Sequence, residues 1–225
     1  MISVIIPAYN EEKALPLTLF YLLGQTGNFE IIVVDGESTD GTRQVVLAER
    51  RAQLLCAPKG RASQMNAGAR VAKGDWFLFL HADTLLPPGA LANLRDVLAE
   101  GRVSAGGFRH RFSGNDWRLR LISWLDNWRC QRTRIIYGDQ ALFVQRALFE
   151  KLGGFPPQPF LEDVRFCEKL LQETRPVLLG EHVITDARKF LQMGVWRSLA
   201  RVFLIIVCYE LKLPVPAHVF FSDVR

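Results

Sequence analysis

The sequence predicts an α/β fold in which a mixed, mostly parallel β-sheet is flanked by helices. The predicted strands are short, almost wholly apolar runs, at residues 2–6, 31–34, 54–56 and 76–80. The predicted helices alternate with them and carry leucine, valine or alanine on one side, at residues 12–23, from about residue 39, at 62–71 and at 88–98. Apolar strands that alternate with helices are typical of parallel sheets covered on both faces.

The alternation weakens beyond residue 100. Strands are predicted there at residues 103–112, 141–144 and 177–179, and helices at 117–130, 162–172 and 195–211. The pair Gly106-Gly107 predicts a bulge or bend in the first of these strands. Without a repeat or a long linker, residues 1–190 are expected to form one domain. Residues 191–225 are expected to form a C-terminal helical appendage, packed on the domain or serving as an interface or membrane contact.

Composition narrows the class of protein only partly. The 225 residues suffice for a sizeable core, and the formal charge of +5 indicates an anionic partner such as a nucleotide, a lipid surface or nucleic acid. The basic residues are dispersed and match no nucleic-acid-binding module, so nucleic acid is not expected. The four cysteines lack metal-site or disulfide spacing, and the chain opens without a basic leader. We expect a cytoplasmic protein, or one on the inner face of the membrane.

Two apolar segments allow more than one interpretation. The run at residues 202–209 is far shorter than the roughly 20 residues that cross a bilayer. It predicts a core helix, with a monotopic membrane contact or an oligomer interface as alternatives. Residues 117–134 contain three tryptophans and five arginines, and Trp124 and Trp128 share one helical face. Core packing is the favoured explanation, and stacking on a sugar or an amphipathic membrane contact is the alternative.

Polar residues follow three of the predicted strands. They lie at residues 7–12, 35–42 and 81–84. Each cluster has a structural explanation of its own, since Asn10 or Asp83 could cap a helix and His81 could be an ordinary buried histidine. In parallel sheets, however, ligands bind at the carboxyl ends of strands. Clusters at three strand ends therefore indicate a ligand site, and the absence of GxGxxG and P-loop motifs argues against a dinucleotide fold or a P-loop.

The motifs VIIPAYNEE, VVDGESTDGT and the acidic strand end at Asp83 together resemble glycosyltransferase family 2, which has the GT-A fold. The resemblance covers residues 2–190. Residues 61–84 and 137–155 are similar to a bacterial branch of transferases associated with radical-SAM/selenodomain proteins. The resemblance implies metal-assisted, inverting transfer of a sugar from a UDP- or GDP-sugar to an acceptor hydroxyl.

Carried over to this sequence, the family pattern assigns the nucleoside to the first two clusters. Ala8, Tyr9 and Glu11 would contact the nucleoside, and Pro7 would fix the turn that presents them. Asp35 would accept a hydrogen bond from the base.

The family pattern places a divalent cation at the fourth strand. Asp83, next to Ala82, would bind Mn²⁺ or Mg²⁺ bridging the diphosphate, since both cations accept oxygen ligands. His81 occupies the position where the family has an acid. An imidazole ligand would favour Mn²⁺ slightly.

The remaining assignments concern the diphosphate, the sugar and the acceptor. Lys59 and Arg61 precede a helix whose N–H groups can face phosphate, although a solvated basic loop is the alternative. The other expected contacts with the donor or the acceptor are Gln64, Asn66, Asp139, Gln140 and Arg188. Glu162-Asp163 resembles the family's ED motif, in which the aspartate deprotonates the acceptor.

Three alternatives remain open. A nucleotide-sugar sensor without efficient transfer is possible, although Asp83 and Asp163 are both present. A nucleotidyltransferase would need a glycine-rich basic loop after the first strand, which residues 7–12 do not supply. The acceptor is either a lipid or a small molecule, and both a peripheral membrane contact and a homodimer are compatible with the sequence.

Overall fold

The computed structural model describes residues 1–158, 161–211 and 213. Residues 212 and 214–225 of the predicted appendage therefore lie outside the described part. In chain order the strands and helices are β1 (Ile2–Ala8), α1 (Leu15–Leu23), β2 (Phe29–Asp35), α2 (Thr42–Leu47), β3 (Ala52–Cys56), α3 (Arg61–Val71), β4 (Trp76–Phe79), β5 (Thr84–Leu85), α4 (Ala90–Ala99), β6 (Ala105–Phe112), α5 (Trp117–Thr133), the 3₁₀ turn η1 (Gly138–Gln140), β7 (Phe143–Gln145), α6 (Arg146–Lys151), α7 (Glu162–Glu173), β8 (Val177–Thr185), α8 (Arg188–Met193) and α9 (Val195–Glu210).

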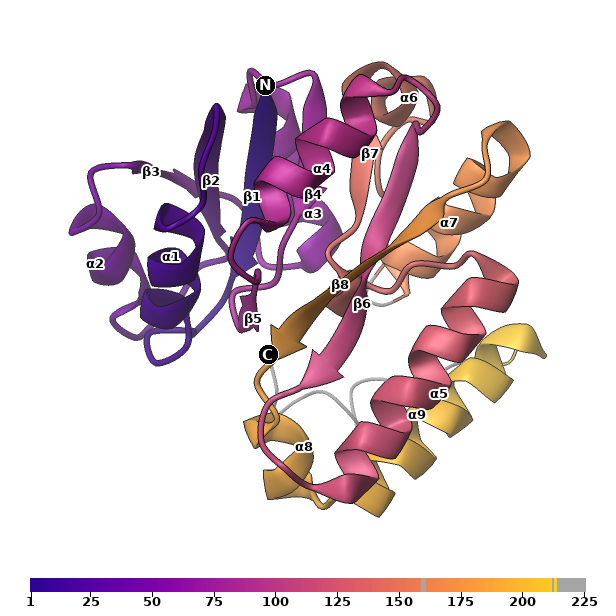
Figure 1. Ribbon diagram of the computed structural model, residues 1–225. Helices are drawn as coiled ribbons and strands as arrows, with labels where there is room; N and C mark the ends of the chain where they lie inside the picture. Colours follow the sequence, from indigo (N-terminus) through magenta and orange to yellow (C-terminus); the bar gives the residue numbers. More distant parts are fainter. Residues whose placement is uncertain (159–160, 212, 214–225) are drawn as a thin grey trace.

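The strands form one eight-stranded sheet in the order β3-β2-β1-β4-β7-β6-β8-β5. The first four strands pair in parallel, as do β6 and β8, whereas β7 runs antiparallel to both of its neighbours and β5 runs antiparallel to β8. The predicted α/β fold with a mixed, mostly parallel sheet is confirmed. Figure 1 shows the N-terminal half of the sheet on the left and β6 and β8 crossing towards the lower part of the molecule.

Helices cover both faces of the sheet because alternate strand residues point to opposite sides. On β1, Val4 and Ile6 pack in one apolar cluster with α1 and α4, whereas Ile5 packs in the other with α3, α6 and α7. At Gly68 an added Cβ would lie 2.5 Å from Ile5 Cγ2. The absence of a side chain at Gly68 therefore allows α3 to pack closely on β1.

The strand irregularity predicted at Gly106-Gly107 occurs one residue later. The register of β6 against β8 shifts between Phe108 and Arg109, where Gly180 and Glu181 of β8 are the extra residues. The glycines have a different role, because a Cβ at Gly106 would lie 2.4 Å from the Val177 carbonyl oxygen. They allow close approach of neighbouring backbone, so the predicted bulge position is wrong.

The prediction that residues 117–134 and 202–209 pack in the core is wrong for one face of each segment. Trp124 and Trp128 on α5 and Phe203 on α9 are exposed, while Leu119, Cys130, Ile205 and Cys208 turn inward. Figure 1 shows α5, α8 and α9 below the sheet, at the carboxyl end of β6 and β8. Among the described residues, no helix combines the length and apolarity needed to cross a membrane.

Candidate active site

A cavity of about 400 Å³ opens at the carboxyl ends of β1 and β4. Pro7 and Ala8 line it from the end of β1. In all, twelve of the predicted site residues line it: Pro7, Ala8, Tyr9, Glu11, Lys59, Arg61, Gln64, His81, Ala82, Asp83, Asp139 and Asp163. These residues come from both halves of the chain, so the fold brings the donor-side and acceptor-side predictions into one space.

The polar cluster after β2 supports the loop after β1. Asn10 Oδ1 accepts a hydrogen bond from Thr39 N, and Asn10 N donates to Ser38 Oγ, both at 2.9 Å. Glu11 N donates to Thr42 Oγ1 at 2.8 Å. These bonds join the two loops and hold the turn that carries Tyr9 and Glu11 at the cavity. Asn10 therefore bonds the neighbouring loop, and the cap on α1, which begins after Ala14, makes no side-chain hydrogen bond.

Two buried polar side chains fix the ends of β1 and β2. Gln64 on α3 donates from Nε2 to the carbonyl oxygens of Ala8 and Val34, each at 2.8 Å. Asp35, fully buried at the end of β2, forms an ion pair of 2.6 Å with Arg43 Nε. The Asp35 carboxylate lies behind the strand ends and not among the cavity-lining residues.

Arg61, the first residue of α3, links the donor side of the cavity to α7. Its Nε lies 3.0 Å from Glu162 Oε1, and its Nη2 lies 3.9 Å from Asp163 Oδ2. Burial disfavours the charged guanidinium, but the carboxylates of Glu162 and Asp163 outweigh that effect and raise the pKa of Arg61. Arg61 thus remains a cation at a wall of the cavity.

Asp163 lies at the start of α7, where the preceding Leu161 adopts a left-handed conformation with φ of 57°. Asp163 Oδ2 accepts a hydrogen bond of 2.7 Å from Gly138 N, and Oδ1 accepts one of 2.8 Å from Val164 N. Both bonds fix the carboxylate while it lines the cavity. An oriented carboxylate beside open space has the geometry that a general base requires.

The loop after β4 carries His81 and Asp83. His81 Nε2 lies 2.6 Å from Arg61 Nη2, and because a guanidinium only donates, Nε2 is the acceptor. Asp83 lines the cavity, so its carboxylate could bind a metal at this edge of the sheet. The acceptor nitrogen of His81 already faces Arg61. The capping alternative for Asp83 is wrong, because β5 follows it directly and α4 begins only after Gly89.

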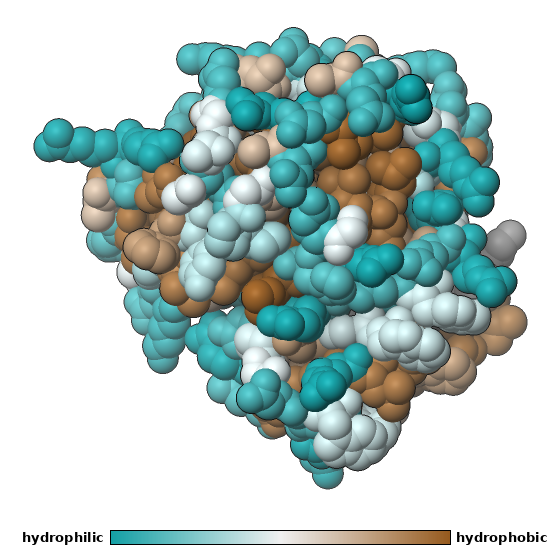
Figure 2. All heavy atoms as spheres, viewed as in Figure 1, coloured by the Kyte–Doolittle hydropathy of each residue, from teal (hydrophilic) through white to brown (hydrophobic). Residues whose placement is uncertain are grey.

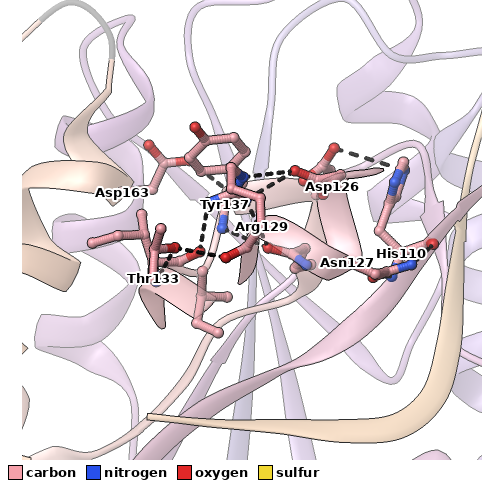
Figure 3. Close-up of polar contacts among 12 residues, drawn as sticks. His110, Asp126, Asn127, Arg129, Thr133, Tyr137 and Asp163 are labelled. Atoms are coloured by element: carbon pink, nitrogen blue, oxygen red, sulfur yellow. Dashed lines mark hydrogen bonds and ion pairs between the residues drawn. The ribbon is translucent and has the colours of Figure 1, made fainter. Parts of the chain in front are cut away.

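A second group of possible cation ligands consists of Asp139, which lines the cavity, together with His110 and Asp126, which do not (Figure 3). The ligand atoms of His110, Asp126 and Asp139 all lie within 4.8 Å of one another. Asp126 Oδ1 accepts a bond of 2.8 Å from Arg129, and His110 Nε2 lies 3.7 Å from Asp139 Oδ2. Burial raises the pKa of Asp139, with His110 acting in the opposite direction. Since Arg129 already neutralises Asp126, this group has less negative charge to offer a cation than its carboxylates alone indicate.

Two aromatic rings of the cavity wall each contact a cation. Lys59 Nζ lies 3.9 Å from the centre of the Tyr9 ring, and the Arg129 guanidinium lies 3.5 Å from that of Tyr137. Burial raises the pKa of Tyr137 to about 12. Tyr137 was not predicted as a site residue, although it directly precedes the Gly138-Asp139-Gln140 segment.

Five predicted site residues are not among those that line the cavity. They are Asp35, Asn66, Gln140, Glu162 and Arg188. Asn66 bonds the backbone of Phe155, and Gln140 accepts a hydrogen bond from Tyr137 N. Arg188 forms an ion pair with Asp186. Three of the five contact residues that line the cavity, since Glu162 pairs with Arg61, Gln140 bonds Tyr137 and Arg188 pairs with Asp186. Glu162, for instance, is buried and holds Arg61.

The apolar wall of the cavity had no specific signal in the sequence. That wall consists of Phe112, Phe190, Met193, Val202 and Ile205. The last four belong to α8 and α9, outside or at the edge of the predicted catalytic domain. The apolar run at residues 202–209 was the only trace of it, and an apolar run does not reveal which face meets a ligand.

Comparison with known proteins shows the family to which the sequence is similar. Residues 3–152 match the family described as Glycosyl transferase family 2. The chain is 29% identical over 189 residues to an uncharacterized glycosyltransferase of Haemophilus influenzae, covering 77% of this chain and 63% of the relative. It is 32% identical over 171 residues to a PGL/p-HBAD biosynthesis glycosyltransferase of Mycobacterium bovis, covering 69% and 63%. The chain thus spans less than two thirds of these relatives.

Solved structures share the fold. The mannosyltransferase PcManGT of Pyrobaculum calidifontis, in complex with GDP-Man and Mn²⁺, superimposes with a TM-score of 0.68 at 25% identity, covering 89% of this chain and 60% of its own. S. aureus TarS in complex with UDP-GlcNAc gives 0.67 at 23% identity, covering 83% and 58%.

Proposed function

The chain belongs to glycosyltransferase family 2, and we propose that it transfers a sugar from a UDP- or GDP-sugar to an acceptor hydroxyl with inversion. One observation carries the proposal. A single cavity combines the end of β1, the Asp83 loop and the Asp163 carboxylate, which come from residues far apart in the chain. The donor range is supported by the GDP-Man and UDP-GlcNAc bound to the structural neighbours.

In the proposed reaction, the acceptor oxygen bonds to the anomeric carbon while the bond from that carbon to the diphosphate breaks. The acceptor proton passes to the Asp163 carboxylate, and the nucleoside diphosphate leaves. Arg61 and Lys59 line the cavity, and in the proposed reaction they would face the diphosphate and stabilise its growing negative charge. Tyr9 and Glu11 would hold the nucleoside, and Asp139 would meet the sugar or the acceptor.

The residues present fit a divalent cation at Asp83. Its carboxylate offers the oxygen ligand that Mn²⁺ and Mg²⁺ take, and diphosphate oxygens would supply further ligands. When bound, such a cation neutralises charge on the leaving diphosphate. The Mn²⁺ bound to the mannosyltransferase of Pyrobaculum supports this assignment, with His81 as a neighbour of the ion or a weaker ligand.

Several finer assignments belong to the same proposal. Residues 1–190 would be the transferase domain and the remainder an added element, and residues 61–84 and 137–155 would place the chain in the radical-SAM/selenodomain-associated branch. The four cysteines form no disulfide, which supports a cytoplasmic protein in a reducing compartment. The acceptor would be a lipid or a small molecule.

The test is a panel of UDP- and GDP-sugars, assayed for transfer or hydrolysis with Mn²⁺ by wild type and Asp163→Asn. Asparagine keeps the size of the side chain and can still accept the hydrogen bond from Gly138 N, while its amide nitrogen cannot accept the one from Val164 N; donor binding, measured separately, should change little. The turnover of the variant should fall by roughly 100-fold or more, as expected for the loss of a general base. Asp96→Asn, at an exposed acid on α4, is the matched control.

Two outcomes would contradict the proposal. If the panel yields tight donor binding without turnover, the protein is a nucleotide-sugar sensor. If Asp163→Asn turns over like wild type, Asp163 is not the base.

A further inference from the structure

The outer face of α5 exposes a row of large apolar side chains. Trp117, Trp124 and Trp128 recur every seven or four residues, with Leu121 and Leu125 between them, so all five lie on one side of the helix. The tryptophans expose 64%, 61% and 49% of their surfaces. The opposite side of α5, with Leu119 and Ser123, is buried against β6 and its surroundings. The packing of α5 on the domain therefore does not involve this row.

Helix α9 extends this row. The rings of Trp117 and Trp196 are in edge contact, with centres 6.5 Å apart. Phe203 and Leu204 are also exposed on α9, Phe203 by 68%. We call the exposed apolar side chains of the two helices, which meet at Trp117 and Trp196, the appendage face; it consists of Trp117, Leu121, Trp124, Leu125, Trp128, Trp196, Phe203 and Leu204. An exposed apolar surface built from so many large side chains marks an interaction site.

The charges around the appendage face are positive. Arg120, Arg132 and Arg197 are exposed on the same two helices. The single acid within α5 is Asp126, which is partly buried and held by Arg129. Over α5 and α9, Figure 2 shows pale and brown side chains interspersed with teal ones. Among the described side chains of these two helices, the apolar and aromatic groups are therefore bordered by cations, with Asp126 as the one carboxylate.

This composition fits an anionic lipid surface better than a second copy of the chain. Tryptophan is enriched at the boundary between lipid and water, and basic residues near an apolar helix face attract anionic headgroups. In a two-fold dimer the same surface meets itself, which would bring arginine borders together without carboxylates to pair them. We propose that the appendage face docks on an anionic lipid bilayer.

The appendage also connects this face to the cavity. Val202 and Ile205 of α9 line the cavity, while Phe203 and Leu204 of the same turns point away to the exposed side. Phe190 and Met193 of α8 extend the apolar wall. Docking would therefore place the apolar wall beside the bilayer, where it would receive an acceptor hydroxyl carried by a lipid. This last step rests on the proposed transferase function, whereas the docking itself does not.

The docking is tested by co-sedimentation of the full chain with vesicles of phosphatidylcholine alone or mixed with phosphatidylglycerol. Wild type should pellet with the mixed vesicles, and less so at high salt. The variant Trp124→Glu/Trp128→Glu should bind at least about tenfold more weakly, because two charges replace interfacial tryptophans. Its matched control is Phe20→Glu/Leu47→Glu, at two apolar side chains that are each 71% exposed on α1 and α2.

A second pair of variants tests the charge. Arg120→Glu/Arg132→Glu should weaken binding to the mixed vesicles by at least about tenfold. Arg50→Glu/Arg70→Glu makes the same change in net charge at exposed arginines elsewhere and should bind like wild type. Tryptophan fluorescence should be quenched by lipids brominated on their acyl chains in wild type and less in Trp124→Glu/Trp128→Glu. Far-ultraviolet circular dichroism checks that each variant is folded.

Three results would overturn docking. The first is that wild type does not pellet with the mixed vesicles, and the second is that Trp124→Glu/Trp128→Glu and its control Phe20→Glu/Leu47→Glu lose vesicle binding equally. The third is a mass, measured by light scattering, that falls from dimer to monomer only in Trp124→Glu/Trp128→Glu and Arg120→Glu/Arg132→Glu. The last would identify a second copy as the occupant. Failure of the transferase proposal is separate, because Asp163→Asn should bind vesicles like wild type. A protein that binds vesicles but turns over no donor would refute only the transfer.

Discussion

Arg61 Nε lies 3.0 Å from Glu162 Oε1, which joins the start of α3 to the start of α7 across the candidate active site. Glu162 is fully buried and does not line the cavity. The pair therefore holds Arg61 in place at the cavity, where its guanidinium also contacts His81 and Asp163. Motifs separated by a hundred residues of sequence meet through this contact.

Breaking this pair should destabilise the protein. Arg61→Met leaves the Glu162 carboxylate buried without its cation, which typically costs about 3 kcal/mol of unfolding free energy. The double variant Arg61→Met/Glu162→Gln should recover much of that loss, because it removes the buried charge as well. Urea unfolding measures both, with Arg70→Met at an exposed arginine of the same helix as control. If the double variant is as unstable as the sum of the two single variants, the pair has no coupling and the interpretation is wrong.

Gly138 should not tolerate a side chain. An added Cβ would lie 2.1 Å from Arg61 Nη2 and 2.5 Å from His81 Nε2, so both groups would have to move into the cavity. We expect Gly138→Ala to lower kcat/KM for the donor on the order of 100-fold, the effect of misplacing site groups by about 1 Å. Gly180→Ala is the matched control, since a Cβ added at Gly180 would meet no described atom within 4 Å. Equal activity in both variants would show that the cavity adapts to the methyl group.

Divalent cations should tighten donor-product binding through Asp83. Calorimetry with UDP or GDP should give a Kd at least about tenfold lower with Mn²⁺ than with EDTA, and Asp83→Asn should abolish the difference. His81→Gln should retain most of it, because His81 Nε2 faces Arg61. A Mn²⁺ effect that survives in Asp83→Asn would assign the cation to other ligands, with His110→Ala as the variant that examines the group of His110, Asp126 and Asp139.

The raised pKa of Tyr137 should lower the unfolding free energy of the protein at alkaline pH. Its pKa is raised to about 12 in the folded state by burial, from the ordinary value of 10.0. Above pH 10 the unfolded chain therefore loses this proton while the folded protein keeps it, so the unfolding free energy falls between pH 10 and 12. Tyr137→Phe should show a smaller fall over that range. Cys130, whose pKa burial raises to about 11, contributes a loss of the same sign in both proteins.

The measurement is urea unfolding at pH 9, 10 and 11, with absorbance at 295 nm to follow tyrosinate. Tyr21→Phe, at an exposed ring, is the control and should leave the slope unchanged. An identical slope in Tyr137→Phe and wild type would mean that the ring does not stay buried at alkaline pH.

Much of the N-terminal fold followed from local pattern. The strands at residues 2–8 and 29–35 are short and apolar on both faces, and a sheet covered by helices on both sides has no other place for such runs. Their carboxyl ends lie side by side, with Ala8 opposite Asp35, for the same reason. That geometry is why residues 7–12 and 81–84 could be expected at one site from the sequence.

The short and irregular elements could not be predicted from the local sequence pattern. The two residues of β5 and the turn of α8 contain too few positions to show a period. Strand β8 extends to Thr185 through Gly180 and Glu181, where the register shift hides the strand pattern. These segments depend on long-range pairing, which a local window of sequence does not contain.

By itself, the sequence determined the α/β class, the order of the N-terminal strands and helices, and the family to which the chain belongs, because those depend on local periodicity and on short motifs. Only the tertiary structure decided that Arg61 is held by Glu162, that α8 and α9 supply the apolar wall of the cavity, and that the tryptophans of α5 face outward. An amphipathic helix shows in its sequence that it has two faces. Which face packs inward depends on what the rest of the chain places beside it, and that is a property of the fold.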